Sequence, residues 1–368
     1  MNAKKYNNIK LIVGIAKSVV SFILIVLFVA FGYSSNLAEY LRNFAANNYF
    51  LLILFTLVTG AAMSLLFFPV KYYVEYRLEH KYNLSNQTIV KWLWEDFKGM
   101  LVGGLIGLPL LSAFYFALDT FGDLWWLPFS VLMFIVSVLL AKIVPIIILP
   151  IFYKILPLEN QDLKSRILNL ADGVGMKVEN VFSFDMSKNT KKANAAFTGL
   201  GKSKKIILGD TLLNEYSNDE IETVIAHELG HYKNKHIIKN IVIGTATSFL
   251  MFFLMAMFYE VSLHWFGFSA RTQVDALPLL TLWAMLIGLI LSPLGNIISR
   301  KFEYEADEYA VRSTNKKEAF IETLNKLTKQ NMGDEEPHPF VEWFFYSHPS
   351  VKKRISFINS IPGIKLES

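Results

Sequence analysis

Two histidines and a glutamate are spaced like residues that bind a metal ion and activate water. They stand in the segment His227-Glu228-Leu229-Gly230-His231. Positions four residues apart share one face of a helix, so both imidazoles could reach a single ion. Glu228, beside the first histidine, could then take a proton from a water that the ion activates. The motif predicts a zinc-dependent hydrolase, and the competing interpretation is a surface helix with two unrelated histidines.

A catalytic zinc ion also needs a third protein ligand and an open position. The best candidate is Glu303, in Ser299-Arg300-Lys301-Phe302-Glu303-Tyr304-Glu305-Ala306-Asp307. Asp307 lies one helical turn further on and could orient a ligand imidazole, whereas Glu305 would point away from Glu303. An ordinary charged helix beside a membrane fits this segment equally well.

The histidine motif must lie on a helix to bind one ion. Ser217 and Glu220 form a capping box that predicts the start of a helix running to about residue 235. Gly230 leaves room for another element to pack closely against this helix. His236 falls off the ligand face, so we expect it at a surface or an interface, like the other histidines outside the motifs (His80, His264 and His338).

The segments around this helix predict a small α/β unit. Short β-rich runs flank the glycine-containing loop Gly199-Leu-Gly-Lys-Ser, which is typical of a hairpin. The expected strands are 181–185, 193–198 and 204–208, and the expected helices are 161–174, 293–314 and 316–330.

Composition places these elements in a membrane protein. Hydrophobic residues make up 53% of the 368 residues, which is too apolar for an ordinary soluble chain. Pro128, Pro145 and Pro150 predict that the fourth apolar run is kinked or continues as a bent helix. Six apolar runs are long enough to cross a bilayer, at 11–33, 50–70, 99–118, 124–149, 240–260 and 277–298.

The distribution of basic residues predicts the orientation. Three lysines precede the first apolar run, five basic residues lie in 71–98, and the opposite loops contain few. The positive-inside rule then puts both termini in the cytoplasm. The predicted division is a transmembrane region of four helices (1–149), a cytoplasmic protease portion with the histidine motif (150–239), transmembrane helices five and six (240–298) and a cytoplasmic portion with the third ligand (299–368).

Nucleic-acid binding and cysteine-dependent sites are both excluded. The basic residues flank the membrane segments instead of forming one groove, so we expect no nucleic-acid partner. The chain has no cysteine, which excludes disulfides, thiolate metal ligands and cysteine nucleophiles.

In these motifs the chain resembles the type I CAAX prenyl endoprotease family, the integral-membrane gluzincins. His227–His231 is similar to the metal motif of that family, and Ser299-Arg300-x-x-Glu303-x-x-Ala306-Asp307 is similar to its third-ligand motif. The resemblance spans about residues 60 to 357, and it includes Leu149-Pro150-Ile151-Phe152-Tyr153-Lys154, Asn194-Ala195, Asp210-Thr-Leu-Leu and Ser347-His348-Pro349.

The resemblance implies a mainly α, polytopic membrane protein with about six transmembrane helices. A gluzincin-like α/β zinc protease domain would lie on the cytoplasmic side. One Zn²⁺ per chain would be held by His227, His231 and Glu303, with Glu228 as the base and Asp307 behind a ligand histidine.

The resemblance also implies roles for four residues outside the metal motif. Asn194 and Ala195 would lie in a strand that pairs with an extended peptide. His348 would stabilise the oxyanion, and Arg354 would meet the terminal carboxylate of the substrate. The competing interpretations are a plain strand residue for Asn194, a capping or core histidine for His348 and a solvated helix face for Arg354.

The predicted function is a zinc metalloendopeptidase that cuts membrane-associated CAAX-type proteins, prenylated or not, near the C-terminus. Its partners would be a peptide or protein substrate and the lipid bilayer, in a bacterial inner membrane or an endoplasmic reticulum membrane. Two alternatives stay open: a quality-control membrane protease without prenyl dependence, and a non-catalytic membrane scaffold with a structural metal site. A site-two-type intramembrane protease is disfavoured because charged residues flank the motif.

Overall fold

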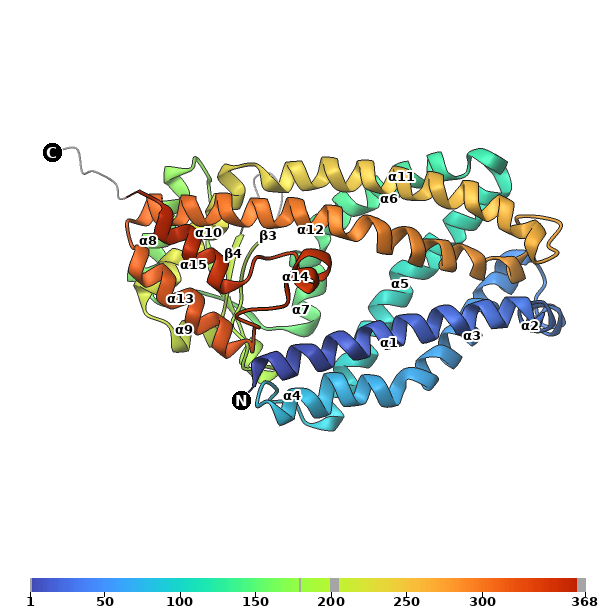
Figure 1. Ribbon diagram of the computed structural model, residues 1–368, viewed down its shortest axis with the longest axis horizontal. Coiled ribbons are helices and arrows are strands. Elements are labelled where there is room, and N and C mark those ends of the chain that lie inside the picture. The colour runs from blue at the N-terminus through green and yellow to red at the C-terminus, as the bar shows by residue number, and fades with distance from the viewer. Residues whose placement is uncertain (1, 179, 199–204, 363–368) are drawn as a thin grey trace.

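The hydrophobic runs of the sequence become long helices. The computed structural model describes residues 2–178, 180–198 and 205–362. Within them, six helices are long and apolar enough to cross a membrane. They form an elongated bundle with a small α/β domain at one end (Figure 1). The prediction of a mainly α, polytopic membrane protein is confirmed. The main α-helical parts of these six membrane helices are α1 (Ala3–Ala30), α3 (Asn48–Lys71), α5 (Ile89–Phe121), α6 (Trp126–Ile143), α11 (His236–Trp265) and α12 (Pro278–Thr314).

Two of the membrane helices continue beyond their α-helical part through a π-helical turn. One turn, at Tyr72–Arg77, leads from α3 into α4 (Leu78–Lys81), and the other, at Val144–Ile148, leads from α6 into α7 (Leu149–Phe152). Pro145 lies in the second turn, where a wider turn accommodates a residue that lacks an amide N–H. The predicted bent continuation of the fourth membrane helix is therefore confirmed.

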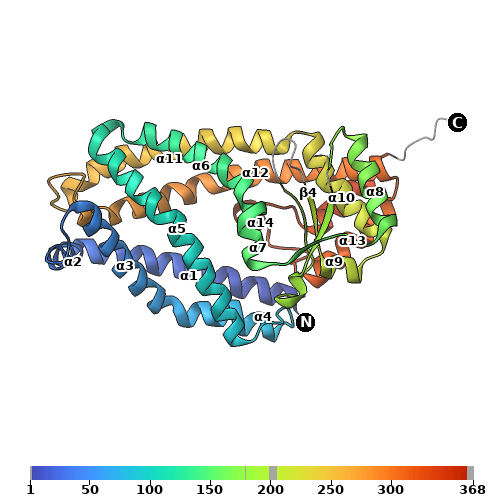
Figure 2. The same cartoon turned by 180° about the vertical axis from the view of Figure 1, so that it is seen from behind.

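The last membrane helix is longer than the sequence suggested. The predicted helices 277–298 and 293–314 are one continuous helix of 37 residues, α12, which contains Pro293. Glu303 and Asp307 therefore lie on a direct extension of a membrane helix. Figures 1 and 2 show α12 running beside α11 for most of its length.

A four-stranded sheet lies where the bundle meets the α/β domain. Its order is β1-β2-β4-β3, with β2 parallel to β4 and the other pairs antiparallel. Among the described strands β3 has a neighbour on one side only, so its other edge is open. The predicted hairpin loop at 199–203 lies outside the described residues. The strands are β1 (Ile155–Pro157), β2 (Val181–Phe184), β3 (Ala195–Thr198) and β4 (Lys205–Gly209).

Short helices surround this sheet and form the core of the domain. The capping box is confirmed: the Ser217 hydroxyl accepts from the Glu220 amide at 3.3 Å, and the Ser217 amide donates to the Glu220 carboxylate at 2.8 Å. Apolar side chains such as Ile167, Ile206 and Ile225 are fully buried between the sheet and the helices. The helices are α8 (Gln161–Gly173), α9 (Asp210–Glu215), α10 (Asn218–Lys233) and α13 (Lys317–Gln330). Two further short helices, α14 (Pro339–Phe345) and α15 (Val351–Ser360), pack against α12.

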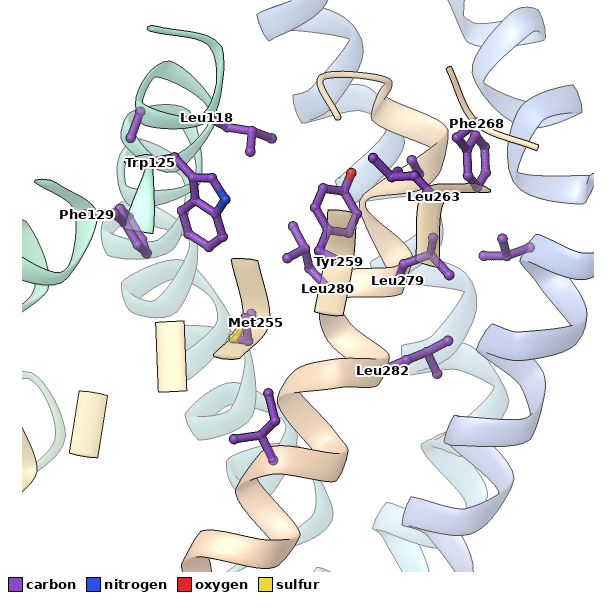
Figure 3. Close-up of a cluster of buried hydrophobic side chains, with 14 residues drawn as sticks. Leu118, Trp125, Phe129, Met255, Tyr259, Leu263, Phe268, Leu279, Leu280 and Leu282 are labelled. Carbon is purple, nitrogen blue, oxygen red and sulfur yellow. The ribbon is translucent and has the colours of Figure 1, made fainter. Parts of the chain in front are cut away.

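A separate aromatic and aliphatic core closes the opposite end of the bundle. Trp125, Tyr259 and Leu279 are buried there at the junction of α5, α6, α11 and α12 (Figure 3). The short helix α2 (Tyr33–Arg42) also lies at this end, while the N-terminus lies at the sheet end (Figure 1). This core holds α11 and α12 together away from the sheet, so that α12 emerges from the bundle in a defined direction toward α10.

Candidate active site

Three side chains of types that can bind a metal ion converge where α10 meets α12. The His227 and His231 Nε2 atoms are 3.2 Å apart. The Glu303 carboxylate lies 3.5 Å from His227 Nε2 and 3.4 Å from His231 Nε2. Ligand atoms about 2.0–2.1 Å from a tetrahedral zinc ion are themselves about 3.3–3.4 Å apart. The spacing of these three side chains therefore fits one zinc ion.

The first histidine is oriented by a carboxylate behind it. His227 Nδ1 lies 2.9 Å from Asp307 Oδ1, and the Asp307 side chain is fully buried. An N–H at Nδ1 donating to this carboxylate leaves the Nε2 lone pair directed at the convergence point. Asp307 is thus placed as the sequence predicted, one turn after Glu303 and behind a histidine.

The second histidine is oriented by His236, a residue expected at a surface or an interface. His231 Nδ1 lies 2.9 Å from His236 Nδ1, and His236 Nε2 lies 2.8 Å from Glu305 Oε2. If His236 donates to Glu305, its Nδ1 accepts from His231, which leaves His231 Nε2 free for a metal. The ring of His236 is buried and stacks on Phe302 at 4.1 Å between centroids.

The expectation that His236 lies at a surface or an interface is wrong. That expectation assumed an unbroken helix through residue 235. Instead α10 ends at Lys233, and Lys235 adopts a left-handed conformation with φ of 58°. His236 then starts α11 and returns beneath His231. Glu305 does point away from Glu303, and in doing so it accepts from His236.

The electrostatics of the site favour a cation. Burial alone would lower the pKa of His227, but the neighbouring carboxylates of Asp307 and Glu303 raise that pKa to about 9. Glu303 Oε2 is buried and has no hydrogen-bond partner among the described residues, as expected of an oxygen that a metal ion would satisfy. Histidine nitrogens with a carboxylate oxygen are a donor set typical of catalytic zinc.

Arg354 forms part of the support for Asp307. Its Nε donates to Asp307 Oδ2 at 2.9 Å and its Nη2 donates to Asp307 Oδ1 at 2.5 Å, a two-pronged arrangement. Arg354 Nη1 also lies 3.9 Å from Glu303. Burial would lower the pKa of Arg354, but the neighbouring carboxylates raise it, so its charge is maintained. The contact of Arg354 with a substrate carboxylate stays a prediction.

Glu228 faces a cleft beside the three converging side chains. The cleft has a volume of ≈ 180 Å³, and its walls also contain Asn194, Ala195 and His348. Burial raises the pKa of the Glu228 carboxyl, and the neighbouring histidines oppose this rise. A carboxylate of raised pKa beside a metal site can accept a proton and later release it.

The cleft has an open strand on one side and an apolar wall on the other. Asn331 holds the approach to β3 by accepting from the Ala193 amide at 2.9 Å and donating to the Ala193 carbonyl at 3.2 Å. The Asn194 carbonyl accepts from the Gly209 amide at 2.9 Å, which extends the pairing with β4. The apolar wall consists of Leu212, Val224, Phe320, Leu324 and Leu327.

His348 lies at the mouth of the cleft. Its Nε2 is 3.4 Å from Glu303 Oε1, and its side chain is 65% exposed, so it can still reach a bound molecule. Arg300 holds the preceding segment by donating to the carbonyls of Glu342 at 3.0 Å and Tyr346 at 2.5 Å. The role of His348 at an oxyanion stays a prediction, and the part played by Arg300 was not assigned from sequence.

Three residues of the site were therefore missed or misjudged: His236, Glu305 and Arg300. Glu305 and Arg300 belong to the third-ligand segment, where their charge next to a metal motif was a usable signal. His236 had a weaker signal, namely Asn234, a residue that favours helix ends, two positions before it. If the helix ends there, His236 is not on the same helix as His231, and its spacing of five residues no longer places it away from the ligand face.

Comparison with known proteins gives matches over both halves of the chain. Residues 157–361 match the family model of peptidase family M48, and residues 1–154 match that of the CAAX prenyl protease N-terminal region, described as having five membrane helices. Among the described residues, four of the six candidate membrane helices lie in that N-terminal part.

Individual relatives agree with these family matches. CAAX prenyl protease 1 of Saccharomyces cerevisiae is 34% identical over 315 residues, covering 80% of this chain and 68% of the relative. The uncharacterized metalloprotease YhfN of Bacillus subtilis is 28% identical over 361 residues, covering 96% and 84%. The crystal structure of S. mikatae Ste24p superposes with a TM-score of 0.87 at 27% identity, covering 97% of this chain and 88% of that one.

Proposed function

Because this chain belongs to peptidase family M48, we propose that it cuts peptide bonds near the C-terminus of membrane-associated, CAAX-type proteins with a zinc ion held by His227, His231 and Glu303. The chain is a multi-pass membrane metalloprotease of the CAAX prenyl protease 1 type. The observation that carries the proposal is the convergence of two Nε2 atoms and one carboxylate beside a cleft with an open β-strand.

The donor set fits one zinc ion per chain. The Nδ1 protons of both histidines are directed to partners behind them, so two unprotonated nitrogens and a buried carboxylate oxygen face one point. When bound, zinc supplies Lewis-acid activation of a water molecule and of the scissile carbonyl. The residues of the chain then hold the ion, move the proton and position the peptide.

Glu228 is the residue we assign to the proton. Its carboxylate takes a proton from the attacking water and hands it to the leaving amine as the C–N bond breaks. The raised pKa of Glu228 suits the first step, because the carboxylate of a weaker acid accepts a proton more readily. His348, at the mouth of the cleft, donates a hydrogen bond to the oxyanion that forms on the substrate carbonyl.

The open edge of β3 provides the place for the substrate backbone. An extended peptide there pairs with β3 as an added strand, with Asn194 and Ala195 beside the scissile bond. The apolar wall opposite, which includes Val224 and Leu324, suits an aliphatic side chain next to that bond. The printed name of the S. cerevisiae relative, a CAAX prenyl protease, supports this substrate class.

We further propose that the active site faces the cytoplasm of a bacterial inner membrane or an endoplasmic reticulum membrane. The support is the distribution of lysine and arginine. The N-terminal lysines and the basic segment 71–98 flank the bundle at the end that carries the sheet, where the positive-inside rule expects the cytoplasm. Substrates tethered to that face of the bilayer would reach the cleft directly.

Two other functions remain to be tested against this one. A quality-control protease would use the same site on membrane-protein tails without prenyl dependence. A non-catalytic scaffold would bind the metal only for structure. Glu228 argues against the scaffold, since a structural site needs no base.

One experiment separates the three. The wild-type protein and Glu228→Gln would be purified in detergent, assayed for zinc and given a fluorogenic farnesylated CAAX peptide and its unprenylated twin. We expect about one zinc per chain in both proteins and cleavage by the wild type only. Preference for the farnesylated peptide supports the CAAX-type class, and equal cleavage supports quality control. Zinc without any cleavage would support the scaffold, and absence of zinc would contradict the proposal.

A further inference from the structure

A second cavity, larger than the cleft, adjoins the active site. Its volume is ≈ 740 Å³, and it shares Ala193, Asn194 and Asn331 with the walls of the cleft. Its remaining walls come from the first turns of α1, from the segment between β2 and β3 (Met186, Thr190 and Lys192) and from the end of α14 with the residue after it. The cavity therefore lies beside the segment that leads into β3, on the side of Asn194 away from the strand.

This cavity carries an excess of positive charge. Its lining includes Lys10 and Lys192, and no described carboxylate belongs to it. Behind the lysines, Glu79 lies 3.1 Å from Lys10 Nζ and 2.8 Å from Lys192 Nζ, and it accepts a hydrogen bond from Tyr6. Two ammonium groups therefore share one carboxylate, which leaves one positive charge.

The lysines retain the means to bind an anion. Lys10 Nζ donates to Tyr6 and Glu79, and Lys192 Nζ is within bonding distance of the same two groups. An ammonium group has three N–H donors, so one donor on each lysine is left for a ligand. The side chains are 40% and 31% exposed, whereas Glu79 is 12% exposed. Glu79 thus holds the lysines from behind while their outer donors face the cavity.

We propose that this lysine pocket, formed by Lys10 and Lys192, binds the free C-terminal carboxylate of the substrate. The proposal rests on the proposed function, a cut near the C-terminus of a peptide laid along β3. A peptide antiparallel to β3 runs C-terminally in the direction from Ala195 toward Lys192, and beyond Ala195 it leaves the strand and passes Asn331, which already bonds to the amide and carbonyl of Ala193. Three extended residues advance about 10 Å, and Ala195 and Lys192 are also three residues apart. A carboxylate three residues beyond the scissile bond would therefore arrive at the pocket.

Other basic groups near the cleft are less suited to this task. Arg354 directs two of its donors to Asp307 and lies within 3.9 Å of Glu303, so its charge is already matched by buried carboxylates. Lys191 points elsewhere and bonds to Asn83. The preference for a substrate with a free C-terminus would then come from the lysine pocket. Without this pocket, the metal site would cut internal peptide bonds equally well.

The test compares two fluorogenic peptides that differ only in ending as a free acid or as a carboxamide. We expect wild-type kcat/KM to be about tenfold higher for the acid, the size of a lost charged hydrogen bond. Lys192→Met and Lys10→Met should each bring the acid-to-amide ratio toward one, mainly by raising KM for the acid. Lys191→Met is the matched control and should keep the wild-type ratio. Lys192→Arg should retain most of the preference.

Using a ratio keeps the test decisive, because misfolding lowers both rates together. If Lys192→Met does not fold, the Lys10→Met variant provides the test, because Lys10 is the more exposed of the two lysines. Equal cleavage of acid and amide by the wild type would overturn the lysine pocket and leave the proposed function intact, whereas cleavage of neither peptide would count against the proposed function. If the variants instead lose only a stimulation by phosphatidylglycerol vesicles relative to phosphatidylcholine, the pocket binds a lipid headgroup and the proposal is wrong.

Discussion

Gly230 on α10 lies directly against Ala306 on α12. A Cβ atom at residue 230 would come within 2.9 Å of the Ala306 Cα and 3.0 Å of the Ala306 carbonyl oxygen. Only glycine lets the two backbones approach this closely. His227 and His231 lie on α10 and Glu303 lies on α12, so the close approach of these two helices controls the spacing of the three converging side chains. The room that the sequence suggested at Gly230 is occupied by α12.

Gly230→Ala should push α10 and α12 apart. Overpacking against backbone atoms costs about 1–3 kcal/mol, and we expect that loss in the free energy of unfolding together with weaker zinc binding. Gly244→Ala is the control, since a Cβ there meets nothing within 4 Å. Thermal unfolding and zinc titration measure both effects. Equal behaviour of the two variants would show that the close contact does not set the site.

His236→Ala should weaken zinc binding without removing a ligand. His231 loses the acceptor that keeps its Nδ1 proton in place, and losses of such supporting partners cost about 10–100-fold in metal affinity. His264→Ala, at the far end of α11, is the matched control. Competition with a chromogenic chelator measures the affinity. An unchanged affinity in His236→Ala would mean that the bond between His231 and His236 is incidental.

Asp307→Asn should be severely destabilising. The change removes the negative charge beside His227 and leaves Arg354 buried without its counter-charge, and breaking a buried ion pair costs about 3–5 kcal/mol. The double variant with Arg354→Gln should cost less than the sum of the two single changes. Chemical unfolding of all four proteins gives the coupling. Strict additivity would contradict the coupling inferred from the structure.

Arg300→Gln should lower kcat while zinc content stays at the wild-type value. The change frees the segment between Glu342 and Tyr346 that positions His348. We expect a loss of about tenfold or more, as for misplaced oxyanion donors. Arg312→Gln, which breaks only an exposed pair with Glu308, is the control. If Arg300→Gln and His348→Gln act independently in the double variant, Arg300 does not work through His348.

The pH profile should show an acidic limb due to Glu228. The base must be deprotonated to act, so kcat/KM rises with pH through the pKa of Glu228. Burial raises this pKa above the ordinary glutamate value of about 4.3, so the limb should lie above that pH. Zinc content measured at each pH separates this loss from release of the metal. A limb at or below the ordinary value would contradict the burial effect.

Much of this protein was predictable from short-range patterns. The capping box, the six apolar runs and the pairing of His227 with His231 depend on residues a few positions apart, where helix geometry decides the outcome. Asp307 could be placed behind a histidine because it follows Glu303 by one turn. The order of the sheet could not be predicted, and β1 was missed because three residues are too few for a periodic signal.

Tertiary structure decided the rest, because it joins residues that local pattern cannot relate. A single left-handed residue, Lys235, joins α10 to α11 and places His236 beneath His231, where a continuous helix could not place it. The cluster of Tyr6 and Lys192 connects positions 186 residues apart. Local patterns in the sequence identified the side chains that are able to bind a metal ion or transfer a proton. Packing of α10 against α12, and of α1 beside the approach to β3, determined which of them meet.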